Sequence, residues 1–327
     1  IKNQLDQIGF YSNSVINKLQ EELAEKLGKI SGYEDDALFL CNSGAEANEN
    51  ALKIASFTSG KKKFITFRNS FHGRTSAVVA ATDDSSIVAP VNETSNFIFC
   101  EWNNAEAFEK LFKENLHDLA GVIIEGIQGI GGIQIPSQEL MSKISELCAE
   151  NSVFFISDEI QSGYARSGKF FAHQHFKVKP DIITTAKGMA NGFPIGGVLV
   201  SSKIPAKHKM LGTTFGGNHL ACAAAIAVLE IIADENLMEE SFQKGVYLIQ
   251  KLQEIPQIKE IRGKGLLIGI DFEIPAAQVS KKLREEHKIF VGSATNPLTM
   301  RLLPPLTISY SEIDYFIASL QSVLNLI

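Results

Sequence analysis

The sequence contains few cysteines, and they are widely spaced. Its 327 residues include four, at Cys41, Cys100, Cys148 and Cys222, without the Cys-x-x-Cys spacing of zinc or redox sites. Neither a metal site nor a disulfide framework is therefore predicted. Reduced thiols are typical of the cytoplasm, which is the expected location of the protein.

Long apolar runs and an excess of basic residues are also missing. The longest apolar run, Leu220–Leu229, falls short of the roughly 20 residues that cross a bilayer, and its alanines indicate a helix packed inside the protein. The first ten residues show no basic segment followed by an apolar stretch, so no signal peptide is expected. With 31 Lys and Arg against 37 Asp and Glu, the net charge is −6. An acidic chain lacks the field that attracts nucleic acid or anionic membranes, and neither partner is expected.

What the chain does contain is an alternation of short apolar runs and helical patterns. Its length suggests about two domains. The runs that predict strands are Ala37–Cys41, Phe64–Phe67, Phe97–Cys100, Gly121–Glu125, Val153–Ser157, Asp181–Thr185 and Val198–Ser201. Helical patterns cover Glu46–Phe57, Ala105–Glu114 and Ser137–Asn151, and an earlier one begins near residue 14. This order predicts an α/β fold with a mostly parallel sheet covered by helices, in which ligands gather beyond the carboxyl ends of the strands.

After about residue 233 the pattern changes. A long helix is predicted at Met238–Glu254, a strand-like stretch at 261–273, and a short helix at Ala276–Glu286. Strands at Ile289–Val291 and Thr299–Leu303 and a last helix at Ser311–Leu324 complete a smaller α+β domain. We therefore expect an N-terminal segment and helix over residues 1–29, a large domain over 30–235 and a small domain over 236–327.

Three patterns at predicted strand ends carry chemistry. Ser43 and Gly44 follow the first strand and open a helix, whose free N–H groups suit a phosphate; alternatively, Ser43 and Glu46 only form a capping box. Asp158 ends a buried strand, where it can pair with a cation in the cleft or cap the next turn. Lys187 follows another strand, and a partly buried lysine can lose its proton and form an imine, although a surface lysine in a glycine-rich loop is the alternative. Together they are the imine partner, nitrogen partner and phosphate anchor of a pyridoxal phosphate site.

The motifs as a set resemble those of class III, fold-type I pyridoxal-phosphate aminotransferases, and specifically the acetylornithine/succinylornithine branch. They are CNSGAEANE (41–49), FHGRT (71–75), EGIQGIGG (125–132), SDEIQSGYARSG (157–168), PDIITTAKGMANGFPIGG (180–197), TTFGGNHLACAAA (213–225), IRGKGLLIGID (261–271) and RLLPPL (301–306). They span nearly the whole chain. The few dozen residues that usually complete the small domain and part of the substrate wall at the family's N-terminus are not in this sequence.

The resemblance implies a role for each matching residue toward pyridoxal 5′-phosphate. Lys187 would bind the cofactor covalently, Asp158 would pair with its pyridine nitrogen, and Gln161 would bond its ring hydroxyl. The remaining cofactor-binding positions would be Ser43, Gly44 and Ala45 at the phosphate, Phe71 stacked on the ring, Glu159 and Ile160 beside Asp158, and Thr214, which would reach the phosphate of the neighbouring subunit. An ordinary core aromatic is the alternative for Phe71. The contact of Thr214 across subunits implies a homodimer with shared active sites.

Substrate contacts follow from the same resemblance. Arg74 would bind a substrate carboxylate, Thr213 would touch the substrate, and Arg301 would hold the α-carboxylate of glutamate or 2-oxoglutarate. A structural salt bridge is the alternative for Arg301. The implied reaction moves the terminal amine of an N-acylated ornithine, acetyl or succinyl, to 2-oxoglutarate in arginine biosynthesis, giving N-acylglutamate 5-semialdehyde and glutamate.

Other reactions share these parts. Ornithine aminotransferase, 4-aminobutyrate aminotransferase and glutamate-1-semialdehyde aminomutase carry the same lysine, aspartate and phosphate cup, and a non-catalytic protein could retain the fold. His72 has no assigned chemistry, and His173 and His175 are expected at the surface because two positions apart on a helix they diverge.

One position departs from the family pattern. Relatives commonly carry a glutamate where this chain has Ile130, and that glutamate would pair with Arg301 while the amine donor is bound. An unpaired arginine in a cleft is costly, so something should compensate for the missing acid. A donor with an extra carboxylate, such as N-succinylornithine, is one hypothesis, and another acid from outside this sequence is the alternative.

Overall fold

The computed structural model describes residues 1–327 and contains two sheets. The larger has seven strands in the order β1-β7-β6-β5-β4-β2-β3. Their bounds are β1 Ala37–Cys41, β2 Lys63–Phe67, β3 Phe97–Cys100, β4 Leu119–Glu125, β5 Phe154–Asp158, β6 Ile182–Thr185 and β7 Gly196–Val200. Six strands run in the same direction, and β7 runs opposite to them between β1 and β6. The predicted α/β fold with a mostly parallel sheet is confirmed.

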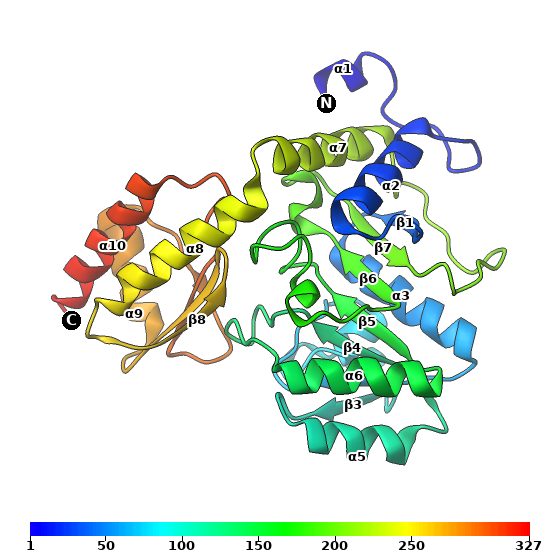
Figure 1. Ribbon diagram of the computed structural model, residues 1–327, viewed down its shortest axis with the longest axis horizontal. Coiled ribbons are helices and arrows are strands. Elements are labelled where there is room, and N and C mark those ends of the chain that lie inside the picture. Colours follow the sequence, from blue (N-terminus) through cyan, green and yellow to red (C-terminus); the bar gives the residue numbers. More distant parts are fainter.

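Helices cover both faces of this sheet because side chains alternate along each buried strand. Ile123 and Val198 point to one face, where they pack with helix α3 (Gly44–Ser59). Val122 and Ile124 point to the other face, against α5 (Ala105–Asn115) and α6 (Gln138–Asn151). On that same face, helices α2 and α7 cover the half of the sheet nearer β1 (Figure 1). Those two helices are α2 Lys18–Ser31 and α7 His219–Asp234.

The segment between β2 and β3 and the segments around β5 to β7 contain only short helices. These are α4 Ser76–Ala80 and the 3₁₀ turns η1 Ser85–Ile87, η2 Pro90–Asn92, η3 Ala172–Phe176 and η4 Lys187–Ala190. Near the N-terminus, α1 (Lys2–Leu5) precedes α2 and lies close to α7 (Figure 1). Nowhere in the chain is a helix long and apolar enough to cross a membrane.

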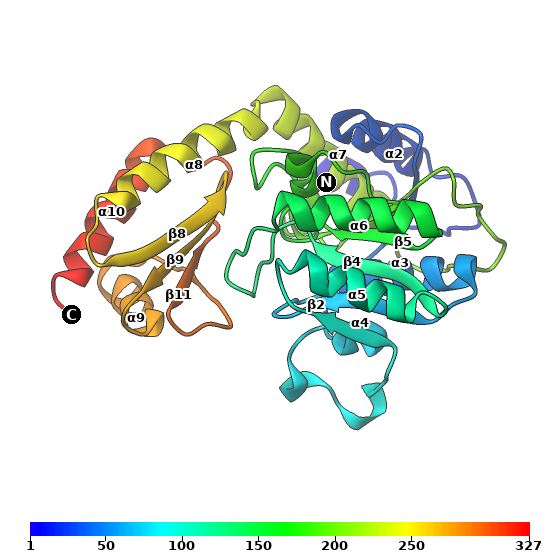
Figure 2. The ribbon, with the colours of Figure 1, turned by 60° about the horizontal axis from the view of Figure 1, so that its bottom comes forward.

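The second sheet has four strands in the order β10-β11-β9-β8 and lies in a separate lobe (Figure 2). Its strands are β8 Ile258–Lys264, β9 Leu267–Phe272, β10 Gly292–Ser293 and β11 Thr299–Leu302. Its helices are α8 Leu237–Gln253, which leads from α7 into this lobe, α9 Ala276–His287 and α10 Tyr310–Leu324. They enclose an apolar core of their own. Division of the chain at residues 29 and 235 stays a prediction.

Two predictions for this lobe were wrong in detail. The stretch 261–273 is not one strand but most of the β8–β9 hairpin, which turns at Gly265, where φ is +54°. No strand forms at residues 289–291, because the N–H of Ile289 closes the end of α9 by donating to the Leu283 carbonyl. The short strand β10 starts only at Gly292.

Candidate active site

A cavity of about 430 Å³ lies at the carboxyl edge of the large sheet. This edge is where the sequence places its chemical groups, because β1, β5 and β6 all end there. Nine of the predicted residues line the cavity: Ser43, Gly44, Ala45, Phe71, Arg74, Asp158, Ile160, Gln161 and Lys187. Ile130 also lines it. The structure therefore brings Lys187 and Asp158 into one cavity.

The first turn of α3 forms one wall. Ser43 is the N-cap, and its hydroxyl accepts a hydrogen bond from the Glu46 N–H at 3.2 Å. The Glu46 carboxylate in turn accepts from the Asn42 N–H, so the capping interaction is present and the same turn also faces the cavity. A Cβ on Gly44 would lie 2.9 Å from Ile160 Cγ2, so only glycine allows this close approach. The free N–H groups and the positive end of the helix dipole favour an anion here.

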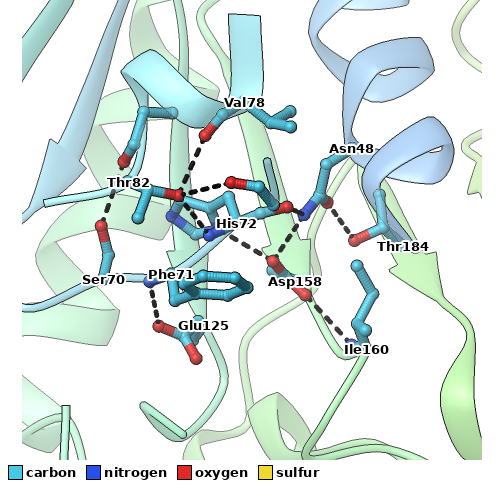
Figure 3. A network of polar contacts seen from close by, with 12 residues as sticks. Asn48, Ser70, Phe71, His72, Val78, Thr82, Glu125, Asp158, Ile160 and Thr184 are labelled. Carbon is cyan, nitrogen blue, oxygen red and sulfur yellow. Dashed lines mark hydrogen bonds and ion pairs between the residues drawn. The ribbon is translucent and has the colours of Figure 1, made fainter. Parts of the chain in front are cut away.

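Asp158 is almost fully buried, and three donors hold its carboxylate (Figure 3). Oδ2 accepts from Asn48 Nδ2 at 2.7 Å and contacts His72 Nδ1 at 2.8 Å. Oδ1 accepts from the Ile160 N–H at 3.0 Å. The turn-capping interpretation therefore holds as well, but two further donors fix the carboxylate against the cavity floor.

Lys187 begins the turn η4 with φ of +41°, a left-handed conformation that costs energy for any residue with a side chain. Its amine makes no hydrogen bond or ion pair within the chain. Water reaches the side chain through the cavity mouth, but protein surrounds it closely enough that burial lowers its pKa, against the opposing effect of Asp158 and Glu125. A lowered pKa raises the fraction of neutral amine, which is the nucleophilic form.

Glu125 closes β4 and faces the same cavity. Its Oε1 accepts from the Phe71 N–H at 3.0 Å and its Oε2 from the Gly129 N–H at 2.8 Å. Burial is the main cause that raises its pKa to about 7. The bond to Phe71 holds the backbone from which the aromatic ring reaches into the cavity.

Arg301 lies on β11 and reaches from the small lobe toward the cavity. Its Nη1 donates to Gln161 Oε1 at 3.0 Å and its Nε donates to the Ser293 carbonyl. No carboxylate lies within ion-pair distance, although Arg301 is only 8% exposed and burial lowers its pKa. Arg301 therefore meets only neutral acceptors within this chain, and a compensating carboxylate from the donor or from outside this sequence stays a prediction. Gly129 makes room for Gln161, because a Cβ there would lie 1.9 Å from Gln161 Oε1.

Glu159 does not line the cavity, although it was predicted among the cofactor-binding positions. Its carboxylate is turned away from the cavity and accepts from Ser162 Oγ at 2.7 Å and from the Ala172 N–H at 2.8 Å. It also contacts His173 Nδ1 at 2.8 Å. The surface prediction for the two histidines was wrong: His173 is fully buried between Glu159 and Tyr33, and His175 is half-buried against Ser167.

Thr213 and Thr214 lie outside the cavity of their own chain. They belong to the loop before α7, where Asn13 Nδ2 donates to both of their carbonyls, at 3.1 and 3.3 Å. Thr214 is exposed, and next to it Phe215 packs against Phe10 with ring centroids 5.0 Å apart. Within one chain the structure does not join these threonines to the other predicted residues.

The sequence interpretation missed three polar groups of the site: Asn48, His72 and Glu125. Each lies inside a motif already singled out, CNSGAEANE, FHGRT or EGIQGIGG. These residues could have been found from the sequence by looking for polar side chains on the buried face of a predicted helix or at the end of a predicted strand.

Comparison with known proteins places this chain among enzymes. The profile described as "Aminotransferase class-III" matches residues 1–324. The chain belongs to the class-III aminotransferases. These enzymes depend on pyridoxal 5′-phosphate, and this aminotransferase is similar to the acetylornithine aminotransferase of Bacillus subtilis, at 41% identity over 99% of this chain and 84% of the relative. It is also 39% identical to the acetylornithine aminotransferase of Archaeoglobus fulgidus, over 96% of this chain and 82% of that relative.

Solved structures agree on the fold. The aminotransferase superimposes on a Bacillus anthracis aminotransferase with a TM-score of 0.90 and 30% identity, covering 100% of this chain and 84% of that one. The ornithine aminotransferase of Toxoplasma gondii, described with partial occupancy of PLP at its active site, also gives 0.90 at 30% identity, over 99% and 81%. The predicted fold-type I architecture is confirmed.

The donor set of the cavity fits this cofactor. A nucleophilic amine is available for the aldehyde, an acid for the ring nitrogen, and a helix N-terminus for the phosphate. Phe71 and Ile160 both line the cavity and would provide apolar surface against the ring. The lack of a Cβ on Gly44 keeps the anion-binding turn against Ile160.

Proposed function

We propose that this aminotransferase transfers the terminal amine of an N-acylated ornithine to 2-oxoglutarate, giving N-acylglutamate 5-semialdehyde and glutamate, as a step of arginine biosynthesis. The observation that carries the proposal is the placement of Lys187 and Asp158 in one cavity with the anion-binding turn of α3. The similarity to acetylornithine aminotransferases over nearly the whole chain supports the choice of donor.

Bound pyridoxal phosphate supplies an aldehyde that takes up the donor's amino group and a ring that accepts electrons from the adjacent carbon. Lys187 Nζ would remove a proton from the carbon that bears that amino group and deliver it to the cofactor carbon that carried the aldehyde. Asp158 would pair with the ring nitrogen and keep it protonated, which would strengthen the electron-accepting ring. Ser43 and the N–H groups of Gly44 and Ala45 would hold the phosphate.

Two arginines provide the substrate contacts in this proposal. Arg74 is exposed at the cavity and has no partner in the chain, so it is free to bind a carboxylate of the donor or acceptor. Arg301 binds the α-carboxylate of glutamate or 2-oxoglutarate. To do so it gives up only its hydrogen bond to a neutral acceptor, Gln161 Oε1. A carboxylate is the stronger partner for a guanidinium, which favours this exchange.

The test is the half-reaction of the purified protein loaded with pyridoxal phosphate, followed by absorption in the absence of 2-oxoglutarate. N-acetylornithine or N-succinylornithine should convert the cofactor spectrum at least about 10-fold faster than ornithine or 4-aminobutyrate. The Lys187→Ala variant should slow conversion by about 100- to 10,000-fold, the usual contribution of a positioned base. Lys62→Ala, at an exposed lysine far from the cavity, is the matched control.

Three results would count against the proposal. Faster conversion by ornithine than by either acylated donor would identify an ornithine aminotransferase, which the similarity to the Toxoplasma gondii enzyme makes the competing assignment. A Lys187→Ala rate near that of the wild type would remove the assigned base. Absence of any Lys187-dependent spectrum would support the alternative that the fold is retained without catalysis.

We further infer a homodimer that shares its active sites and resides in the cytoplasm. The predicted contact of Thr213 and Thr214 with ligands is absent within one chain, and exposed apolar residues accompany their loop: Phe215 is 58% exposed, Tyr11 66% and Ile16 82%. A second copy packed on this face would cover them. The cytoplasmic location rests on the four cysteines, which are all buried and unpaired.

A further inference from the structure

Asn48 is a fully buried amide that contacts the cavity-lining Asp158, and it is outside the set of residues discussed for cofactor binding. It lies on α3 four residues after Gly44, so both residues are on one face of the helix. Its Nδ2 donates to Asp158 Oδ2 at 2.7 Å and to the His72 carbonyl at 2.8 Å. Its Oδ1 accepts from Thr184 Oγ1 at 2.7 Å (Figure 3).

These contacts fix the orientation of the amide. Two acceptors surround Nδ2 and a hydroxyl donor faces Oδ1, so a flipped amide would set its oxygen against two other oxygens. Thr184 lies on β6 directly beside Asp158 on β5. Asn48 therefore bridges the ends of two neighbouring strands from the helix that covers them.

The two oxygens of Asp158 are used unequally. Oδ2 meets both Asn48 and His72, which occupies its two lone-pair directions, whereas Oδ1 accepts only the N–H of Ile160. One acceptor position of Oδ1 is therefore left for a ligand. Without Asn48 the carboxylate could turn about its Cβ–Cγ bond and exchange the roles of the two oxygens.

We propose that Asn48 is a positioning residue that sets Asp158 Oδ1 toward the ring nitrogen of the cofactor, in register with the phosphate held one helical turn earlier on α3. The inference rests on the proposed function, because it assigns a direction to the acid that serves this cofactor. Helix α3 then fixes the spacing between the anion-binding turn at Gly44 and the hydrogen bond from Asn48 to Asp158.

The test compares Asn48→Ala with Asn50→Ala in the protein loaded with pyridoxal phosphate. Asn50 is the matched control, because its amide bonds only to the Glu46 carbonyl of its own helix. Asn48→Ala should lower the rate constant of the half-reaction by roughly 10- to 100-fold, the usual effect of losing a hydrogen bond to a charged group. The KM for the donor should change less than about 3-fold, since Asn48 does not touch the donor.

Two measurements without turnover separate positioning from general damage. The absorption band of the bound cofactor, titrated with pH, should shift its midpoint in Asn48→Ala and not in Asn50→Ala. The affinity for pyridoxal phosphate should likewise fall in Asn48→Ala and stay unchanged in Asn50→Ala. A variant that was merely destabilised would lose cofactor on heating but keep the wild-type titration curve.

Thr184→Val decides the matter if Asn48→Ala does not fold. It keeps the side-chain shape and removes the hydroxyl that holds Asn48 Oδ1, so the same spectral shift is expected with a smaller loss of rate. Wild-type rates and spectra in either soluble variant would overturn the inference while leaving the proposed function intact. Failure of the wild type itself to show a Lys187-dependent band would overturn both.

Discussion

Glu125 is a carboxyl group whose surroundings favour its neutral form. Burial is the largest cause that raises its pKa from 4.5 to about 7, although the N–H groups of Phe71 and Gly129 act in the opposite direction. Between these two pH values the native chain retains a proton that the unfolded chain releases. The free energy of unfolding must therefore decrease as pH rises through this range.

The Glu125→Gln variant should lose this dependence of the free energy of unfolding on pH. In the wild type the group lowers the free energy of unfolding by up to about 3 kcal/mol between pH 4.5 and 7. Urea unfolding at pH 5 and pH 7.5 measures the difference, which should be smaller in the variant by a similar amount. Glu139→Gln, at an exposed residue on α6, should keep the wild-type difference. Equal pH dependence in Glu125→Gln and wild type would contradict the neutral form.

Residue type and position along the strand predicted that Lys187 and Asp158 would lie close together, because the carboxyl ends of parallel strands meet at one edge. The same reasoning left His72 without a role, since its contact with Asp158 joins residues 86 positions apart. Ile130 was a clear departure in the sequence, but the neutral partner that Arg301 finds in Gln161 lies 140 residues away. Pairings of this kind depend on how the two lobes meet.

At the scale of the element, the start of α3 combines two functions that the sequence offered as alternatives. Ser43 caps the helix through the Glu46 N–H, and the same turn lines the cavity. The Ser43 hydroxyl accepts the Glu46 N–H through a lone pair, and its own hydrogen makes only a long hydrogen bond of 3.4 Å to Glu46 Oε1, which an anion can replace. Capping and phosphate binding are therefore compatible.

The Ser43→Ala and Ser137→Ala variants separate the two functions. Ser137 caps α6 in the same way, through the Leu140 N–H at 3.1 Å, but lies away from the cavity. Both variants should lose about 1 kcal/mol of stability. Only Ser43→Ala should also weaken binding of pyridoxal phosphate, by about 10-fold. Spectroscopic titration checks the affinity, and equal affinities in the two variants would remove Ser43 from the phosphate site.

Element boundaries in the second lobe show where local signals fail. The glycines at 263 and 265 both adopt positive φ, and the second makes the hairpin turn within an otherwise strand-like run. The apolar residues 289–291 have strand composition, but the end of α9 uses the amide of Ile289. In both places a backbone conformation, which composition does not specify, decided the outcome.

At the scale of the whole molecule, the loop of Thr214 and the N-terminal segment form one surface. Asn13 ties the loop to that segment, and Phe10 packs on Phe215. Their exposed apolar side chains lie outside every core cluster of the chain. The proposed homodimer uses this surface, and in that proposal Thr214 of one copy reaches the active site of the other.

Mixing two impaired variants tests this arrangement. Lys187→Ala removes the amine and Thr214→Glu places a negative charge where a phosphate would bind, so each alone should lose most activity. A mixed dimer contains one site with both native residues, and random exchange of subunits should restore about a quarter of the wild-type activity. Light scattering should give about twice the 35.8 kDa of one chain. A monomer, or mixtures no more active than their components, would contradict shared sites.

The sequence by itself determined the strands of the large sheet, the helices between them and the edge at which reactive side chains meet, because apolar periodicity and strand polarity are local properties. It also predicted that Lys187, Asp158 and the first turn of α3 would lie together, and the structure places them in one cavity. Only the tertiary structure decided what surrounds them: Asn48 and His72 on Asp158, Glu125 beneath Phe71, and Gln161 against Arg301. Those contacts join distant segments, and hydrogen bonds of this kind require positions accurate to a few tenths of an ångström, which follow from packing of the whole chain.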